Sequence, residues 1–202
     1  MNARLRHLTA ACAAAAAILG SVSCGDLARQ GSGPSFLTVD SLQAASGAAP
    51  GTFGATLSSD VITLVNATVN GVAVKVPTIF EDPGQIILRL ELKDLGPPAT
   101  PNTPSDNNSV IINRYHVAYR RSDGRNVQGV DVPYAFDGAV TFTVANSPEA
   151  VGFTLVRGQA KSEAPLRALA NGGSRVFIST IADVTFYGHD VAGNDVSVTA
   201  SI

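Results

Sequence analysis

The chain of 202 residues contains no tryptophan, one methionine and two cysteines, and only 15% of its residues are charged. Its 14 Lys and Arg are outnumbered by 16 Asp and Glu, so it lacks the basic surface of a nucleic-acid-binding protein. Aromatic residues make up only 6%, which weighs against a carbohydrate-binding platform because such platforms favour exposed rings.

Familiar catalytic and metal-binding motifs are also missing. The sequence has neither a Gly-x-Ser-x-Gly motif nor a Ser-x-x-Lys pairing, which are signatures of common hydrolases. Outside the first residues it has two histidines, His116 and His189, without the spacing of a zinc site. We therefore expect no catalytic residues and no cofactor.

The amino terminus has the layout of an export signal. Arg4 and Arg6 precede an apolar run over 8–20, and the small residues Ser21-Val22-Ser23 lead to Cys24. A membrane-spanning helix needs about 20 apolar residues, so this shorter run predicts a secretion signal that is removed.

The exit from that run resembles the lipobox of bacterial lipoproteins. Val22 and Ser23 fit the pattern, whereas Ser21 stands where such sites usually carry leucine. The resemblance implies cleavage before Cys24 and a membrane anchor through lipid on that cysteine. The alternative is an ordinary signal peptide with an incidental Cys24. Because Cys12 is removed with the signal, Cys24 is left without a disulfide partner, and acylation would remove that free thiol.

Three segments follow from this cleavage site. Residues 1–23 are the signal peptide, 24–34 form a flexible tether, and 35–202 form one β-domain. Gly25 follows Cys24, and Asp26 comes one place later; by analogy with enterobacterial lipoproteins this arrangement favours the outer over the inner membrane. We expect a protein of the cell envelope.

Alternating apolar and polar residues predict half-buried strands joined by turns. In 86–93 the apolar members are Ile86, Leu88, Leu90 and Leu92; similar alternation occurs over 113–120, 140–144, 182–187 and 196–202. Further strands are expected at 36–42 and at 72–76 after an Asn70-Gly71 turn, with an irregular connection over 44–56. One short helix is expected near Pro165, packing Leu166 and Leu169 and ending at Asn171-Gly172-Gly173. The fold class is an all-β antiparallel sandwich.

The stretch from Val184 to Val198, with its Asp190-Val191-Ala192-Gly193-Asn194 turn, resembles the last hairpin of bacterial immunoglobulin-like domains. It lacks the cysteines and the tryptophan of antibody domains. The resemblance implies an immunoglobulin-like β-sandwich and no particular activity.

If 113–121 is strand C and this hairpin is the F–G pair, the strands are neighbours in one sheet. Their outward residues then form a mixed basic, acidic and aromatic face. Its members are Arg114, His116, Arg120, Asp183, Thr185 and Tyr187, with His189 at the edge. We predict that this face recognises a protein partner; the alternative is an ordinary solvated sheet face.

The same topology brings the loop 95–109 beside the turn 190–195 at one end of the sandwich. These loops carry oxygen ligands that suit calcium, namely Asp106, Asn107, Asn108, Asp190, Asn194 and Asp195. Asn and Asp are also common turn formers, so a purely structural role is the alternative.

These patterns predict a lipid-anchored, non-enzymatic interaction or structural module. Its partner would be an envelope protein or a glycan. A carbohydrate- or calcium-binding module, or an accessory domain that uses the loops at one end, is the alternative function.

Overall fold

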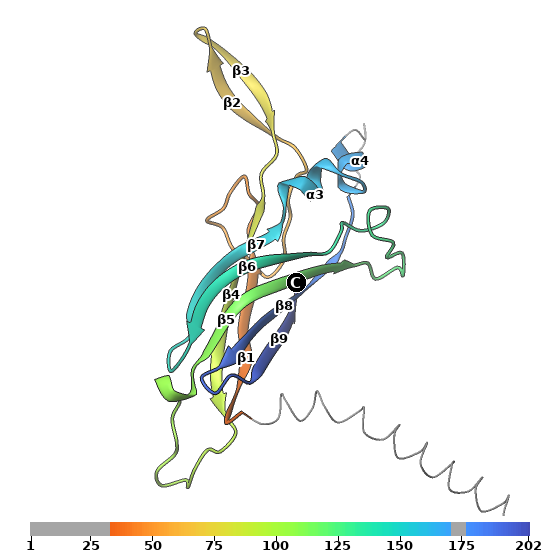
Figure 1. The fold of residues 1–202 in the computed structure, drawn as a ribbon. Coiled ribbons are helices and arrows are strands. Elements are labelled where there is room, and N and C mark those ends of the chain that lie inside the picture. The colour runs from red at the N-terminus through yellow and green to blue at the C-terminus, as the bar shows by residue number, and fades with distance from the viewer. Residues whose placement is uncertain (1–32, 171–176) are drawn as a thin grey trace, which may run out of the picture.

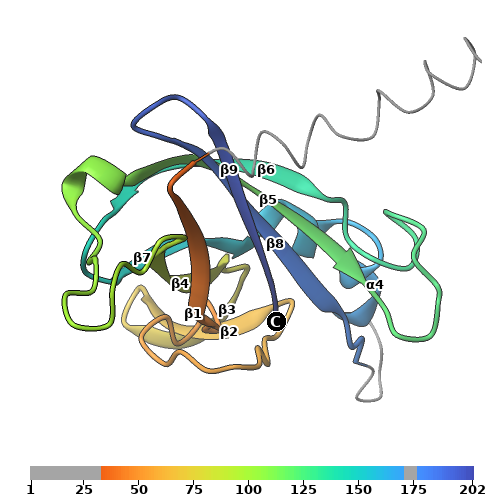
Figure 2. The ribbon, with the colours of Figure 1, turned by 90° about the horizontal axis from the view of Figure 1, so that it is seen from below.

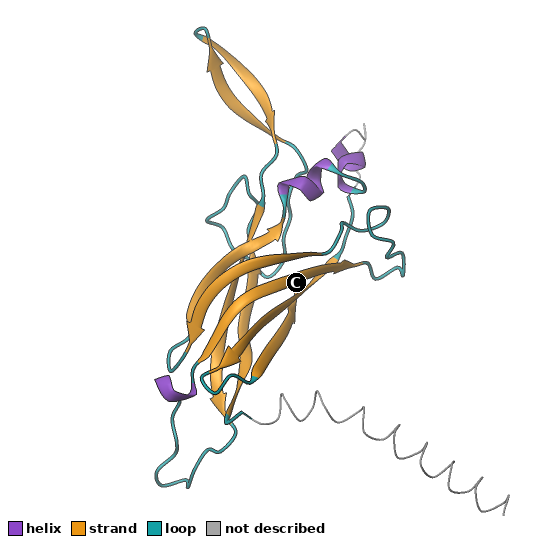
Figure 3. Cartoon of the chain, in the orientation of Figure 1, coloured by secondary structure: helices purple, strands orange, loops and turns teal. Residues whose placement is uncertain are grey.

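The computed structural model describes residues 33–170 and 177–202, which form antiparallel sheets with two short α-helices (Figures 1 and 3). The elements in chain order are β1 (Ser35–Ala44), β2 (Thr63–Val69), β3 (Val72–Thr78), β4 (Asp82–Leu92), the 3-10 turn η1 (Asp106–Asn108), β5 (Val110–Arg120), β6 (Phe136–Val144), β7 (Glu149–Val156), α3 (Gly158–Ser162), α4 (Leu166–Ala170), β8 (Ile181–Asp190) and β9 (Asp195–Ser201).

Two sheets make up the body of the molecule. One has the order β1-β4-β7 and the other β6-β5-β8-β9 (Figure 2). The alternation in the sequence sets which side chains each sheet buries. Ile86, Leu88 and Leu90 of β4 are buried, whereas the intervening Arg89 is exposed. One sheet therefore packs against the other around a single shared hydrophobic core.

Aromatic rings connect the two sheets at the centre of this core. The Phe186 ring of β8 lies 5.9 Å from that of Tyr115 on β5 and 5.3 Å from that of Phe153 on β7. The Tyr119 hydroxyl on β5 donates a 2.6 Å hydrogen bond to the carbonyl of Leu155 on β7. Burial raises the pKa of Tyr119 strongly, and nearby Arg157 offsets part of that effect.

The expected strands are confirmed, and all but the last are longer than expected. The strands expected at 36–42, 72–76, 86–93, 113–120, 140–144, 182–187 and 196–202 correspond to β1, β3, β4, β5, β6, β8 and β9. The expected irregular connection over 44–56 consists of turns and bends closed by a bridge between Ala44 and Gly54. Strands β2 and β7 were not expected, although Val65, Ala67 and Val69 alternate with polar residues in β2, and Val151, Phe153 and Leu155 alternate with Gly152 and Thr154 in β7.

One helix was expected near Pro165, but the structure has two helices in this region. The chain forms α3 and α4, five residues each, with Pro165 between them. Leu166 and Leu169 are half-buried, as expected for one face of a helix. The predicted helix end at 171–173 lies outside the described residues.

Strands β2 and β3 form a separate hairpin that projects from the body beyond β4 (Figure 1). The turn residues Asn70 and Gly71 both have positive φ, 52° and 80°, which is the geometry of a type I′ turn. The Asn-Gly turn expected here is therefore confirmed. The start of β1 lies at the end of the molecule opposite to this hairpin (Figure 1).

The predicted signal peptide over 1–23, the lipidated Cys24 and most of the tether lie outside the described residues. None of the helices in the described part of the chain is long and apolar enough to span a membrane.

Candidate functional site

The outer face of the four-stranded sheet gathers the residues expected on it. Strand β8 lies between β5 and β9, so the predicted neighbour relation of these three strands is confirmed. A bulge between Ile112 and Arg114 shifts the register once, after which outward residues face each other in pairs. Arg114 is paired with Tyr187, and His116 with Thr185.

Two direct side-chain contacts join β5 and β8 on this face, one within the register pair of Arg114 and Tyr187 and one diagonal, between Arg120 and Asp183. The Arg114 guanidinium carbon lies 4.2 Å from the centre of the Tyr187 ring, which is a cation-π contact. Arg120 donates to Asp183 through Nε at 2.6 Å, and Ser201 of β9 also donates to Asp183. The hydrogen bond from Arg120 lowers the pKa of Asp183, although partial burial opposes this effect.

Neighbouring strands extend this polar face. His116 Nδ1 lies 3.1 Å from a carboxylate oxygen of Asp137 on β6. The hydroxyls of Thr185 and Thr199 on β9 are 2.9 Å apart. His189, at the predicted edge, pairs in register with Ile111 and with Asp195. The result is an ordered surface whose charged and aromatic groups are held in place by one another.

The loop end of the sandwich does not gather the carboxylates expected to bind calcium. The residues that the structure describes contain no group of three or more Asp, Glu, His or Cys side chains able to hold a metal ion. Instead, Asp190 accepts hydrogen bonds from the backbone N–H groups of Ala192 and Asn194, at 2.9 and 2.8 Å, and from the Asn194 side chain at 2.8 Å. The turn-forming role, which was the alternative, accounts for this carboxylate.

Asp190 is therefore expected to stabilise the β8–β9 hairpin. Burial acts to raise its pKa, but the hydrogen bonds from Asn194, Ala192 and Gly193 outweigh burial and lower it. Replacing Asp190 with alanine should destabilise the fold by about 2 kcal/mol, because several charge-assisted hydrogen bonds are lost. Urea denaturation measures this change. The exposed Asp195 serves as control, and its replacement should have little effect.

The effect of Asp190 should depend on pH in one direction. A carboxylate with a lowered pKa stabilises the fold above its ordinary pKa of about 3.9 and loses that contribution as pH falls through the lowered value. The stability difference between the unsubstituted chain and D190N should therefore shrink as pH falls below about 4. An undiminished difference would contradict this role of the charge.

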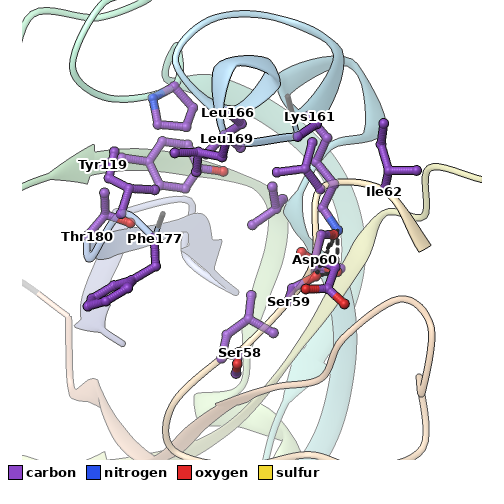
Figure 4. Close-up of a pocket in the computed structure, with 17 residues that line it drawn as sticks. Ser58, Ser59, Asp60, Ile62, Tyr119, Lys161, Leu166, Leu169, Phe177 and Thr180 are labelled. Atoms are coloured by element: carbon purple, nitrogen blue, oxygen red, sulfur yellow. Dashed lines mark hydrogen bonds and ion pairs between the residues drawn. The ribbon is translucent and has the colours of Figure 1, made fainter. Parts of the chain in front are cut away.

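A cavity of about 460 Å³ lies at the opposite end, under α3 and α4 (Figure 4). Its apolar wall includes Ile62, Leu166 and Leu169, and Tyr119 also lines it. Below them, Ser59 and Asp60 contribute polar groups (Figure 4). The sequence predicted the two leucines as helix-packing residues but gave no sign of the cavity.

A buried ion pair forms the polar side of this cavity. Lys161 Nζ donates to Asp82 Oδ1 at 2.8 Å, and both side chains are almost fully buried. Lys161 also donates to Ser59 Oγ at 2.9 Å and to the Asp60 carbonyl at 3.2 Å. All three ammonium protons thus have acceptors, and the Ser59 hydroxyl donates to Asp82 at 2.8 Å. Ser59 and Lys161 are hydrogen-bonded to each other, as a catalytic serine and its base could be. Their hydrogen bonds, however, join α3, β4 and the loop before β2.

The sequence does not predict this cluster of Lys161, Asp82 and Ser59, because no local motif indicates it. Lys161 and Asp82 are 79 positions apart, and Lys161 lies in a short helix without capping signals. No protein-family model, curated protein or solved structure matches the chain.

Proposed function

We propose that the chain is a lipid-anchored, immunoglobulin-like module of the cell envelope, which acts by binding another envelope component. The outer face of the β6-β5-β8-β9 sheet is the recognition surface, and lipid on Cys24 holds the domain to the outer membrane. No catalytic step is assigned to it.

The strand order supports the immunoglobulin-like type. Sheet β9-β8-β5-β6 has the order of strands G-F-C-C′, and sheet β1-β4-β7 has the order A-B-E. The chain visits these strands in the same sequence as an immunoglobulin-like domain, with the β2–β3 hairpin inserted between A and B.

The single observation that carries the binding role is the ordered pair Arg114 and Tyr187. A guanidinium stacked on an aromatic ring, on a half-exposed sheet, combines two of the residue types that are enriched in protein interfaces. The two side chains already contact each other, so less side-chain freedom is lost when a partner covers them. Arg120, fixed by Asp183, extends the surface along β5.

The hydrogen bonds of the buried lysine in the cavity under α3 and α4 support a structural role for this cluster over a catalytic one. Lys161 is paired with a carboxylate and donates all three protons, so it is not a free base for Ser59. Lys161 and Ser59 have a structural role, because their hydrogen bonds hold α3, β4 and the loop before β2 together.

Envelope fractions passed over immobilised domain test this proposal. The unsubstituted domain should retain a partner, and Arg114→Glu combined with Tyr187→Ala should reduce recovery at least about tenfold, since interface hot spots cost 2 kcal/mol or more. Arg89→Glu is the matched control, because Arg89 lies on the outer face of the other sheet in a similar ion pair with Asp40. Equal recovery with both variants would remove the recognition role from this face.

Carbohydrate binding at the loop end is the second candidate. A cavity of about 480 Å³ lies there, lined by the polar side chains of Asp94, Asn102, Thr103 and Asn108. Glycan arrays test this candidate. Binding that is lost in Asn102→Ala would support it, and the absence of any bound glycan would count against it.

A further inference from the structure

The β2–β3 hairpin is an addition that the sandwich does not need. Strands β1 and β4 pair directly with each other, although the 45–81 segment that contains the hairpin separates them in sequence. The hairpin belongs to neither large sheet. An isolated two-stranded hairpin is only marginally stable in water, so a further strand or a covering surface is needed to stabilise it.

Its side chains are unusually apolar for such an exposed element. None of the residues in β2 and β3 is buried, and Leu64, Val69 and Val72 are more than half exposed, at 55, 53 and 62%. The register places six aliphatic side chains on one face as cross-strand pairs: Val65 with Val76, Ala67 with Val74, and Val69 with Val72. Within 61–80 the only charged residue is Lys75.

The two free edges of the hairpin differ. In a type I′ hairpin the pair beside the turn, Val69 and Val72, is hydrogen-bonded, and pairs alternate from there. The backbone groups of every second residue therefore point outward. On β3 these outward positions include Lys75 and Pro77, a charge and a residue without an N–H, both of which block strand pairing.

The edge of β2 has no such protection. Its outward positions are Leu64, Asn66 and Thr68, and β2 contains neither a charge nor a proline. Natural proteins usually block exposed edges, so an unblocked edge beside a blocked one marks the side where a strand is added.

We propose that this edge pairs with the same edge of a second copy of the chain. An antiparallel β2–β2 pairing about a two-fold axis at Asn66 uses all seven residues of the strand. It places Val65 opposite Ala67 of the second copy, and Thr63 opposite Val69, so that the apolar faces join. No charged residue is brought opposite a like charge. The result is a four-stranded sheet with the order β3-β2-β2-β3.

Other occupants fit less well. A lipid bilayer would cover the apolar face but would leave the unpaired N–H and C=O groups of both edges in hydrocarbon, at a cost of several kcal/mol per group.

The size of the contact sets the expected affinity of the dimer. The strand pair is about 23 Å long. Pairing by itself buries less than the roughly 1,200 Å² of a standard interface. The antiparallel arrangement also brings the turn of one copy beside Ile62 at the base of the other, which is 40% exposed, and so covers further apolar area. We expect micromolar association.

Cysteine cross-linking in cells that express the full chain tests this register. Asn66→Cys places two cysteines on the axis with Cα atoms about 5.5 Å apart, which is a distance that a disulfide spans. Thr68→Cys is the matched control, since its image lies four residues further along the strand. After mild oxidation, non-reducing gels should show at least about ten times more dimer for N66C than for T68C. Co-expressed L64C and T68C chains should form the mixed dimer.

Equal dimer yields from N66C, T68C and Ala73→Cys on the β3 edge would overturn the proposal, because they indicate random encounter. Absence of dimer from N66C, in a chain whose thermal unfolding matches the unsubstituted protein, would overturn it as well.

A second variant tests the edge without any cysteine. Asn66→Pro removes one outward N–H and leaves the hairpin pairs intact, so sedimentation at about 100 µM should show loss of the dimer. An unchanged dimer in N66P would exclude this edge. The sedimentation test uses no introduced cysteine and does not depend on lipid at Cys24, so its outcome is separate from that of the proposed function.

Discussion

Replacing Lys161 with methionine is expected to destabilise the protein by about 3–5 kcal/mol, because it leaves the buried Asp82 carboxylate without its counter-ion. Methionine fills a similar volume, so the loss comes mainly from the charge. Three hydrogen bonds that join α3, β4 and the loop before β2 disappear with the ammonium group. Urea denaturation monitored by circular dichroism measures the change.

The exposed pair between Arg89 and Asp40 supplies the control for this prediction. Its 2.8 Å contact is as short as that of the buried pair, but solvent screens it, so Arg89→Met should change stability little. Adding Asp82→Asn to Lys161→Met removes the unpaired charge and should recover part of the loss. Equal effects of Lys161→Met and Arg89→Met would mean that burial of the pair does not matter.

Replacing Phe186 with alanine is the second large effect, again about 3–5 kcal/mol. Phe186 is fully buried, and its ring lies between 5.3 and 6.4 Å from the rings of Tyr115, Phe142 and Phe153. Removing the ring leaves a cavity where the two sheets meet. Thermal and urea unfolding should both shift.

Phe177→Ala is the matched control, because the same ring is removed at a position that is 84% exposed. It should leave the free energy of unfolding nearly unchanged. A loss at Phe177 comparable to that at Phe186 would contradict the assignment of the core to the space between the sheets.

The main strands could be predicted because their alternation is set locally. In β4 and β8 each second residue is apolar, so the sequence alone indicates which face is buried. The β8–β9 turn could be predicted as well, because Asp190 and Gly193 are typical of such turns. The neighbour relation of β5 and β8 came from the resemblance to immunoglobulin-like hairpins.

The remaining features depend on tertiary contacts. Strand β7 is an exception, because Val151, Phe153 and Leu155 alternate with Gly152 and Thr154 and its own pattern is compatible with the strand that pairs with β4. The burial of Lys161 requires Asp82 and Ser59, which come from distant segments, so no local pattern predicts it. The calcium prediction rested on composition, and composition did not reveal that Asp190 is engaged by its own turn.

The proposed functions divide the molecule into three regions. The chain enters β1 at one end, where the proposed lipid anchor would hold it, and the β2–β3 hairpin projects from the other end (Figure 1). The proposed recognition face lies along the side, on the outer face of the β6-β5-β8-β9 sheet. If the domain is anchored as proposed, the hairpin would lie on the side away from the membrane.

Mass spectrometry of the amino terminus of the protein, extracted from membranes of a cell that expresses the full chain, tests the central claim most directly. A lipid-anchored module should begin at Cys24, carry lipid on that residue and lack residues 1–23. An unmodified Cys24, or cleavage at another position, would contradict the anchored module proposed for this chain.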